Sequence, residues 1–184
     1  MFIASEKRKQ NIAEYLLYMW QIEDIIRANN LDLDKLEENV ISKFNLEPDA
    51  HKQMHEWYES LIDMMRREGV VEHGHLQINK NTLSQLVDLH QELLKDPKYS
   101  DYSAEFYKTL PFIVELRAKA AENAVGEIET CFTALYGYLM LRLAGKETNP
   151  ETDKAMKQIS RFVALLAHYF KLKQEEEEEK VING

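Results

Sequence analysis

Residues 159–170 read Ile-Ser-Arg-Phe-Val-Ala-Leu-Leu-Ala-His-Tyr-Phe, and their apolar side chains recur every three or four positions. This period is that of an α-helix with one buried face. The start of the helix is marked as well, because Asn149 is a favoured N-cap residue and Pro150 suits the first helical position. The pattern therefore predicts a helix over residues 150–174 with an apolar inner face and a charged outer face.

The rest of the chain repeats this signal and contains few helix breakers. Its 184 residues include only 6 Gly and 4 Pro, where average usage gives about 13 and about 9. Apolar periodicity and capping residues predict helices over residues 5–28, 33–44, 49–68, 82–95, 102–124, 126–144 and 150–174. We therefore expect an all-α fold, a multi-helix bundle of about six to seven helices in a single domain over residues 1–174.

Local signals predict where these helices begin, end or bend. Asp32 is the expected N-cap of the second helix, and Asn45 is its expected stop. Thr82 opens a capping box and predicts the start of the fourth helix, after an irregular stretch that forms either a short hairpin or a loop. Pro111 predicts a kink or a break inside the fifth helix.

The widest apolar arcs belong to helices 5–28 and 126–144, and we expect both to lie at the centre together with helix 150–174. These apolar arcs are wider than packing on one neighbour requires. They predict either packing on several neighbours within the monomer or a homodimer face. Cys131 and His90 fall on apolar faces, which predicts a small core residue and a hydrogen-bonded core histidine. Core positions are also expected for the aromatic residues Trp20, Trp57, Tyr58, Tyr136 and Tyr138.

The net charge of −9 is concentrated in two places. Residues 31–60 hold eight acidic and three basic side chains, and residues 173–184 hold five and two. No segment is basic enough to neutralise many phosphates, so we expect no nucleic-acid partner. Residues 175–184 form an acidic tail, which we expect to fray because a helix C-terminus disfavours anions.

The sequence also predicts the compartment. No apolar stretch approaches the ~20 residues that a membrane-spanning helix needs, and the first residues lack the apolar core of a signal peptide. The single cysteine rules out an internal disulfide and suits a reducing compartment. We therefore expect a cytoplasmic protein without a membrane partner.

Two charged residues fall on apolar arcs and are candidate buried polar residues. Glu23 lies on the apolar side of the first predicted helix. Around the axis of the sixth predicted helix, Arg142 falls between Cys131 and Leu135. In one interpretation, the two residues pair with each other across the core or line a polar pocket. In the other, Glu23 pairs with Arg27 one turn on, and Arg142 extends to solvent from a helix end.

A metal site is the next hypothesis. His51, His55 and Glu59 are four residues apart along one helix, and two histidines at that spacing can hold one metal ion with a carboxylate added. The same side chains suit the boundary of an apolar face, and the zinc-protease motif is absent. We expect no metal and no cofactor, and we keep a metal-dependent or hydrolytic enzyme built on residues 51–90 as an alternative.

A second alternative is an RNA-cleaving enzyme. Arg161 with His168, and Arg67 with His73, have spacings that resemble the arginine–histidine element of HEPN-type ribonucleases. The element is too short to be specific, and the acidic surface argues against RNA binding.

Our main expectation is therefore a non-catalytic helical interaction protein that self-associates as a homo-oligomer through its helix faces.

Three stretches resemble one uncharacterised family. They are residues 1–24, which begin Met-Phe-Ile-Ala-Ser-Glu-Lys-Arg, residues 127–142, which contain Cys-Phe-Thr-Ala-Leu-Tyr-Gly-Tyr, and residues 159–170. The family is a domain of unknown function of similar length, found mainly in Bacteroidetes. The resemblance implies a stand-alone helical domain from a bacterial cytoplasm, and it transfers no catalytic residue.

Overall fold

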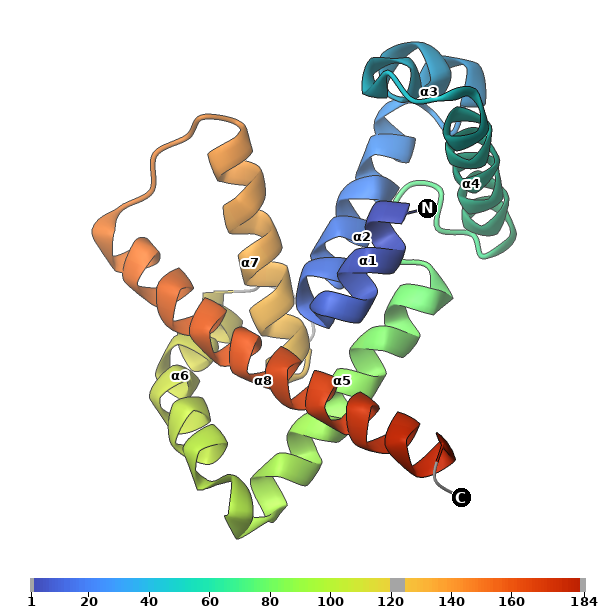
Figure 1. Cartoon of the computed structure of the whole chain (residues 1–184). Helices are drawn as coiled ribbons and strands as arrows, with labels where there is room; N and C mark the ends of the chain where they lie inside the picture. Colours follow the sequence, from blue (N-terminus) through green and yellow to red (C-terminus); the bar gives the residue numbers. More distant parts are fainter. Residues whose placement is uncertain (1, 120–124, 183–184) are drawn as a thin grey trace. The chain divides into compact units, whose positions relative to one another are not determined.

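The computed structural model describes residues 2–119 and 125–182, in which every regular element is helical (Figure 1). These described residues form eight α-helices, rather than the predicted six to seven. The elements are α1 Phe2–Gln10, α2 Ile12–Ala28, α3 Leu33–Asn39, η1 Ile41–Phe44, α4 Pro48–Arg67, α5 Gln77–Lys95, η2 Pro97–Tyr99, α6 Ser100–Lys119, α7 Glu127–Leu143 and α8 Pro150–Ile182, with η marking 3₁₀ turns. The all-α prediction is confirmed.

The chain divides into two compact units. Unit 1 consists of Met1–Gln10 and Glu14–Thr82, and unit 2 consists of Asn11–Ala13 and Leu83–Gly184. The division falls inside α5. The expected single domain over residues 1–174 therefore stays a prediction. Of the three helices expected at one centre, α2 belongs mainly to unit 1, whereas α7 and α8 belong to unit 2.

Two predicted helices are each split by a local cause. The first is interrupted at Asn11, whose side-chain oxygen accepts the backbone N–H of Ala13 at 3.0 Å and so starts α2 as a cap. The second is interrupted at Val40, where a φ of −129° leaves the helical region and turns Ile41 inward, fully buried. Asp32 caps α3 and Asn45 ends η1 at a φ of 46°, as predicted.

Of the two alternatives for the irregular stretch over residues 69–80, the structure has the loop, but the predicted helix start at Thr82 is wrong. Within this fully described stretch there is no hairpin, and α5 begins at Gln77 rather than Thr82. The Thr82 hydroxyl instead donates to the carbonyl of Ile78 inside the helix. Gly69, with a φ of 69°, ends the preceding helix in the left-handed conformation.

Unit 2 is built around α8, which packs on α6 and on α7, while α6 also packs on α7 (Figure 1). No break occurs at Pro111, because α6 runs through it to Lys119; the rest of the predicted helix, residues 120–124, lies outside the described residues. The structure extends α8 to Ile182, beyond the predicted end at residue 174. Fraying of its acidic end stays a prediction.

The core of unit 2 is aromatic around His90. Its Nδ1 atom lies 2.7 Å from the hydroxyl oxygen of Tyr102, and the rings of Phe106 and Phe162 contact it edge-on. Burial lowers the pKa of His90 from its ordinary value. The prediction of a hydrogen-bonded core histidine is therefore confirmed, as is that of a buried Cys131, whose thiol pKa burial raises to about 12.

The burial of the sixth predicted helix, which is α7, differs from the expected one. In α7 only the first half is buried, at Ile128, Thr130, Cys131 and Phe132. The second half, with Leu143 at 67% exposure, is open. Trp20 and Tyr58 are buried, whereas Trp57, Tyr136 and Tyr138 are only half-buried. In the part of the chain that the structure describes, we find no helix with the length and apolar content to cross a bilayer.

Candidate interaction surface

Glu23 is the buried polar residue that the sequence singled out, and its carboxylate joins α2 to the start of α5. The side chain is fully buried. Its Oε1 accepts the backbone N–H of Leu76 at 2.9 Å and the side-chain amide of Asn79 at 2.7 Å. Its Oε2 lies 2.6 Å from Nδ1 of His75. These partners satisfy the carboxylate away from water, as a buried charge requires.

Two neighbours of Glu23 on α2 also contact the loop between α4 and α5. Trp20, three residues earlier, stacks on the His75 ring with centroids 4.1 Å apart. Arg27, four residues later, donates to the carbonyl oxygens of Val70, at 3.1 Å, and of Gly74. One stripe of α2 therefore fixes the loop between α4 and α5, because helix positions three and four apart share a face.

This loop also explains where α5 starts. The first N–H groups of a helix have no partner within the helix. Glu23 accepts the N–H of Leu76, and Glu68 accepts the N–H of Gln77 at 2.6 Å. Two carboxylates at a helix N-terminus also interact favourably with the helix dipole. A carboxylate–histidine pair can move protons in enzymes; here both carboxylate oxygens also hold the loop between α4 and α5.

The hydrogen bonds that satisfy Glu23 come from unit 1, whereas Arg142 belongs to unit 2. Arg142 is exposed near the end of α7, where it donates to the hydroxyl oxygen of Tyr138 at 3.1 Å and lies over that ring. The alternative pairing of Glu23 with Arg27 is wrong, because the ion pair of Arg27 is with Asp24 at 2.8 Å. The expectation that Arg142 reaches solvent from a helix end is confirmed.

The histidine stripe of α4 does not assemble a metal centre. His51 is paired with Glu37 of α3, with Nε2 2.7 Å from Oε1. His55 is half-buried and Glu59 is exposed. Throughout residues 2–119 and 125–182, no group of three or more His, Cys, Asp or Glu side chains is placed to hold a metal ion.

The arginine–histidine pairs are exposed. Arg161 and His168 lie on the outer face of α8, while Arg67 ends α4 and His73 lies in the following loop. Exposure alone neither assembles nor excludes a cleavage site. The ribonuclease alternative stays a prediction.

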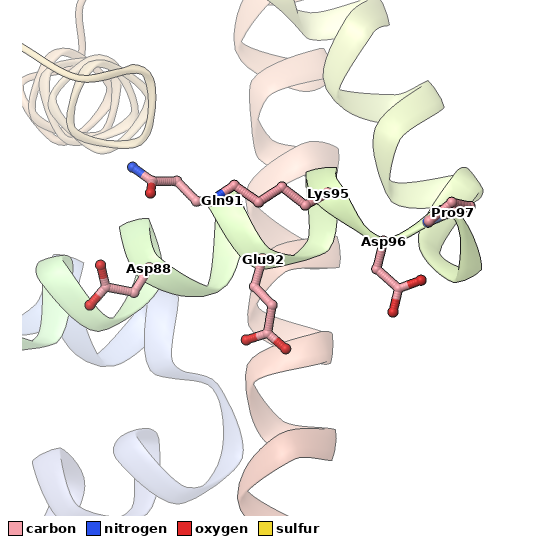
Figure 2. A pocket seen from close by; sticks show the side chains of 6 residues that line it. All are labelled: Asp88, Gln91, Glu92, Lys95, Asp96 and Pro97. Atoms are coloured by element: carbon pink, nitrogen blue, oxygen red, sulfur yellow. The ribbon is translucent and has the colours of Figure 1, made fainter.

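A hollow on unit 2 is lined by α5 and the turn that follows it (Figure 2). The carboxylates of Asp88, Glu92 and Asp96 are spread along the chain and do not converge (Figure 2). Glu92 already pairs with Lys173 of α8. The lining contains neither histidine nor cysteine, and among the described residues its carboxylates are not grouped to hold a metal ion.

The exposed feature with a clear pattern is α6, which has two apolar faces. Its inner face carries the buried residues Tyr102, Phe106, Thr109 and Ile113. Its outer face carries a second row of exposed residues, which we call the outer stripe: Ala104, Tyr107, Pro111, Val114 and Ala118. Tyr107 is 64% exposed and Val114 is 57% exposed. Soluble proteins seldom leave a regular apolar row uncovered.

Charges flank the outer stripe. Lys108 lies beside Tyr107, and its Nζ is 3.5 Å from Glu105. Glu115 lies beside Val114, and its carboxylate is 2.6 Å from Nζ of Lys119. Both flanking side chains are exposed, so their charges are available to a partner that covers the stripe.

Sequence reasoning missed this surface, although the signal was present. The stripe alternates steps of three and four residues, which is the seam of a helix pair. Pro111 conceals it, because a proline inside the pattern predicts a kink or a break between the two halves. The continuity of α6 makes them one face.

The fold thus defines the class of protein: an all-α chain of two compact helical units. The chain belongs to the family described as Domain of unknown function (DUF4924), whose model matches residues 1–178. The expected membership of an uncharacterised helical family is therefore confirmed. No curated protein and no solved structure matches the chain.

Proposed function

We propose that this protein is a non-catalytic interaction protein that associates with a second copy of itself through the outer stripe of α6. The observation that carries the proposal is the exposure of Tyr107 and Val114 on a helix whose opposite face is already buried in unit 2. The inner face of α6 already packs on α7 and α8, so its second apolar face is available for another helix.

The size of the stripe limits the affinity. It extends over part of one helix, and an interface of this kind is at the small end of specific protein contacts. Association costs translational and rotational freedom that a small interface offsets only in part. We therefore expect a reversible dimer with a dissociation constant on the order of 0.1 mM or tighter.

The enzyme alternatives have less support from the geometry. In the region of residues 51–90, His51 is engaged with Glu37, His75 with Glu23, and His90 with Tyr102. These contacts explain three of the five histidines of this region as structural residues.

Sedimentation velocity of the full chain over a hundredfold range of concentration tests the proposal. The sedimentation coefficient should rise with concentration and should stay at the monomer value in Tyr107→Glu and Val114→Glu. Val181→Glu is the matched control, because it adds the same charge at an apolar residue that is 83% exposed on another helix. A wild-type chain that stays monomeric at the highest concentration contradicts the proposal.

A further inference from the structure

We infer that the two copies pair through antiparallel α6 helices in one register, in which Lys108 of each copy faces Glu115 of the other. The inference rests on the proposed self-association and adds the direction and register of the contact. It follows from the spacing of the outer stripe, the sizes of its side chains and the signs of the charges beside it.

The spacing assigns each residue a place in the helix pair. Steps of three and four residues put the stripe at the two core positions of a seven-residue repeat. Lys108 and Glu115 each follow a core residue directly, and they are seven residues apart. They therefore occupy the same flanking position in successive repeats. In an antiparallel pair, this position of one helix lies beside the same position of the other.

The charges select one register. Three antiparallel alignments place core residues opposite core residues along this stretch. One brings Lys108 opposite Lys108 of the second copy, and another brings Glu115 opposite Glu115, so both place like charges together. The third, central alignment brings Lys108 opposite Glu115 twice, once on each side of the symmetry axis. Opposite charges at flanking positions set partner choice and orientation in helix pairs.

The central alignment also matches large side chains with small ones. It places Tyr107 opposite Ala118 of the second copy and Pro111 opposite Val114. Side chains that alternate in size fill an interface without overlap or gaps. In the central alignment the symmetry axis passes between Pro111 and Val114. This alignment therefore pairs a longer part of the outer stripe than the other two.

A parallel arrangement lacks these features. It would place Tyr107 on Tyr107 and Pro111 on Pro111, and it would put the uncharged Leu110 beside Glu115. No ion pair would form across such an interface. Substitution of the two flanking charges therefore distinguishes the arrangements.

The test uses charge reversal in the full chain, with sedimentation equilibrium as the measurement. Lys108→Glu and Glu115→Lys each place like charges together in both contacts, and each should weaken self-association by about tenfold. The double variant Lys108→Glu/Glu115→Lys restores opposite charges and should return to within about threefold of the wild type. An equimolar mixture of the two single variants should form mixed dimers that are tighter than either variant alone.

The outcomes separate this inference from the proposed function. Both substitutions also disturb pairs within α6, with Glu105 and with Lys119. The double variant disturbs both pairs at once, so recovery of its association is an effect between copies and not within one helix. Self-association that is unchanged in all the variants overturns the antiparallel register but leaves the proposed function intact. A wild-type chain that is strictly monomeric overturns both.

Discussion

The imidazole Nδ1 of His75 lies 2.6 Å from the carboxylate Oε2 of Glu23, although the two residues are 52 positions apart in the chain. The contact joins the middle of α2 to the loop that precedes α5. Stacking of His75 on Trp20 fixes the plane of the imidazole ring. Glu23 is fully buried and His75 is half-buried, so loss of the contact leaves an interior carboxylate oxygen without its partner and should be visible as a loss of stability.

We predict that Glu23→Gln lowers the free energy of unfolding by about 2–4 kcal/mol, because the amide cannot accept from all three donors. The amide nitrogen would be a donor where the carboxylate has only acceptors. The melting temperature, followed by circular dichroism, should fall by at least about 5 °C. Glu38→Gln is the matched control: Glu38 is exposed on α3, and its substitution should change stability by less than about 0.5 kcal/mol. Equal melting temperatures for the two variants would contradict the structural role of Glu23.

A second prediction concerns acid. Burial lowers the pKa of His90, whereas the unfolded chain binds a proton near the ordinary pKa of about 6.5. The unfolded state therefore holds more protons as the pH falls below about 6.5, and the stability contributed by neutral His90 is lost in that direction. Chemical unfolding at about pH 7.5 and about pH 5.5 measures the loss.

His90→Gln supplies the control for the acid effect. Glutamine does not titrate, and its side-chain oxygen can still accept from Tyr102. The variant should lose less stability than the wild type between the two pH values. The exposed histidines are unchanged in both proteins and cancel in the comparison. An identical pH dependence in the two proteins would show that His90 is not the group responsible.

Cys131 gives a third prediction. The thiolate is the reactive form, and burial raises the pKa of this thiol to about 12. A thiol reagent at about pH 8 should therefore modify the folded chain only through transient opening, on a scale of hours. In denaturant, one equivalent should react at once, since the chain has a single cysteine. Rapid labelling of the folded chain would mean that α7 is not packed as described.

The acidic end of α8 gives a fourth prediction. Glu175–Glu179 bring five negative charges close to a helix C-terminus, where the dipole disfavours them. Amide hydrogens from about residue 175 to 182 should exchange much faster than those around Phe162, which is fully buried. Exchange at comparable rates in the two segments would contradict the predicted fraying.

Much of the fold could be predicted because it depends on local signals. Asp32 and Asn45 mark helix ends through their own backbone and side-chain chemistry, and the structure confirms both. The burial of His90 and Cys131 followed from helical periodicity in the same way. These features need only residues that are neighbours in the sequence.

The wrong predictions have one cause in common. In each case the residue interacts with a segment that is distant in the sequence. The capping box at Thr82 predicts too late a start for α5, because the true caps of this helix come from Glu23 and Glu68. Periodicity gives the face on which Glu23 lies but not the segment that covers it, so it does not predict the partners of this carboxylate. Similarly, Pro111 breaks no helix because the packing of α6 on α7 and α8 supports it.

Helical periodicity and capping act over a few positions, so the amino-acid sequence alone predicts the all-α class, several helix ends and the burial of single residues. The loop that surrounds Glu23 and the open face of α6 become visible only in the folded chain. Both depend on contacts between segments far apart in the chain, and a carboxylate or an apolar stripe of the same sequence can be satisfied by many partners. Packing chose His75, Leu76 and Asn79 for Glu23, and it left Tyr107 and Val114 exposed on the outer stripe.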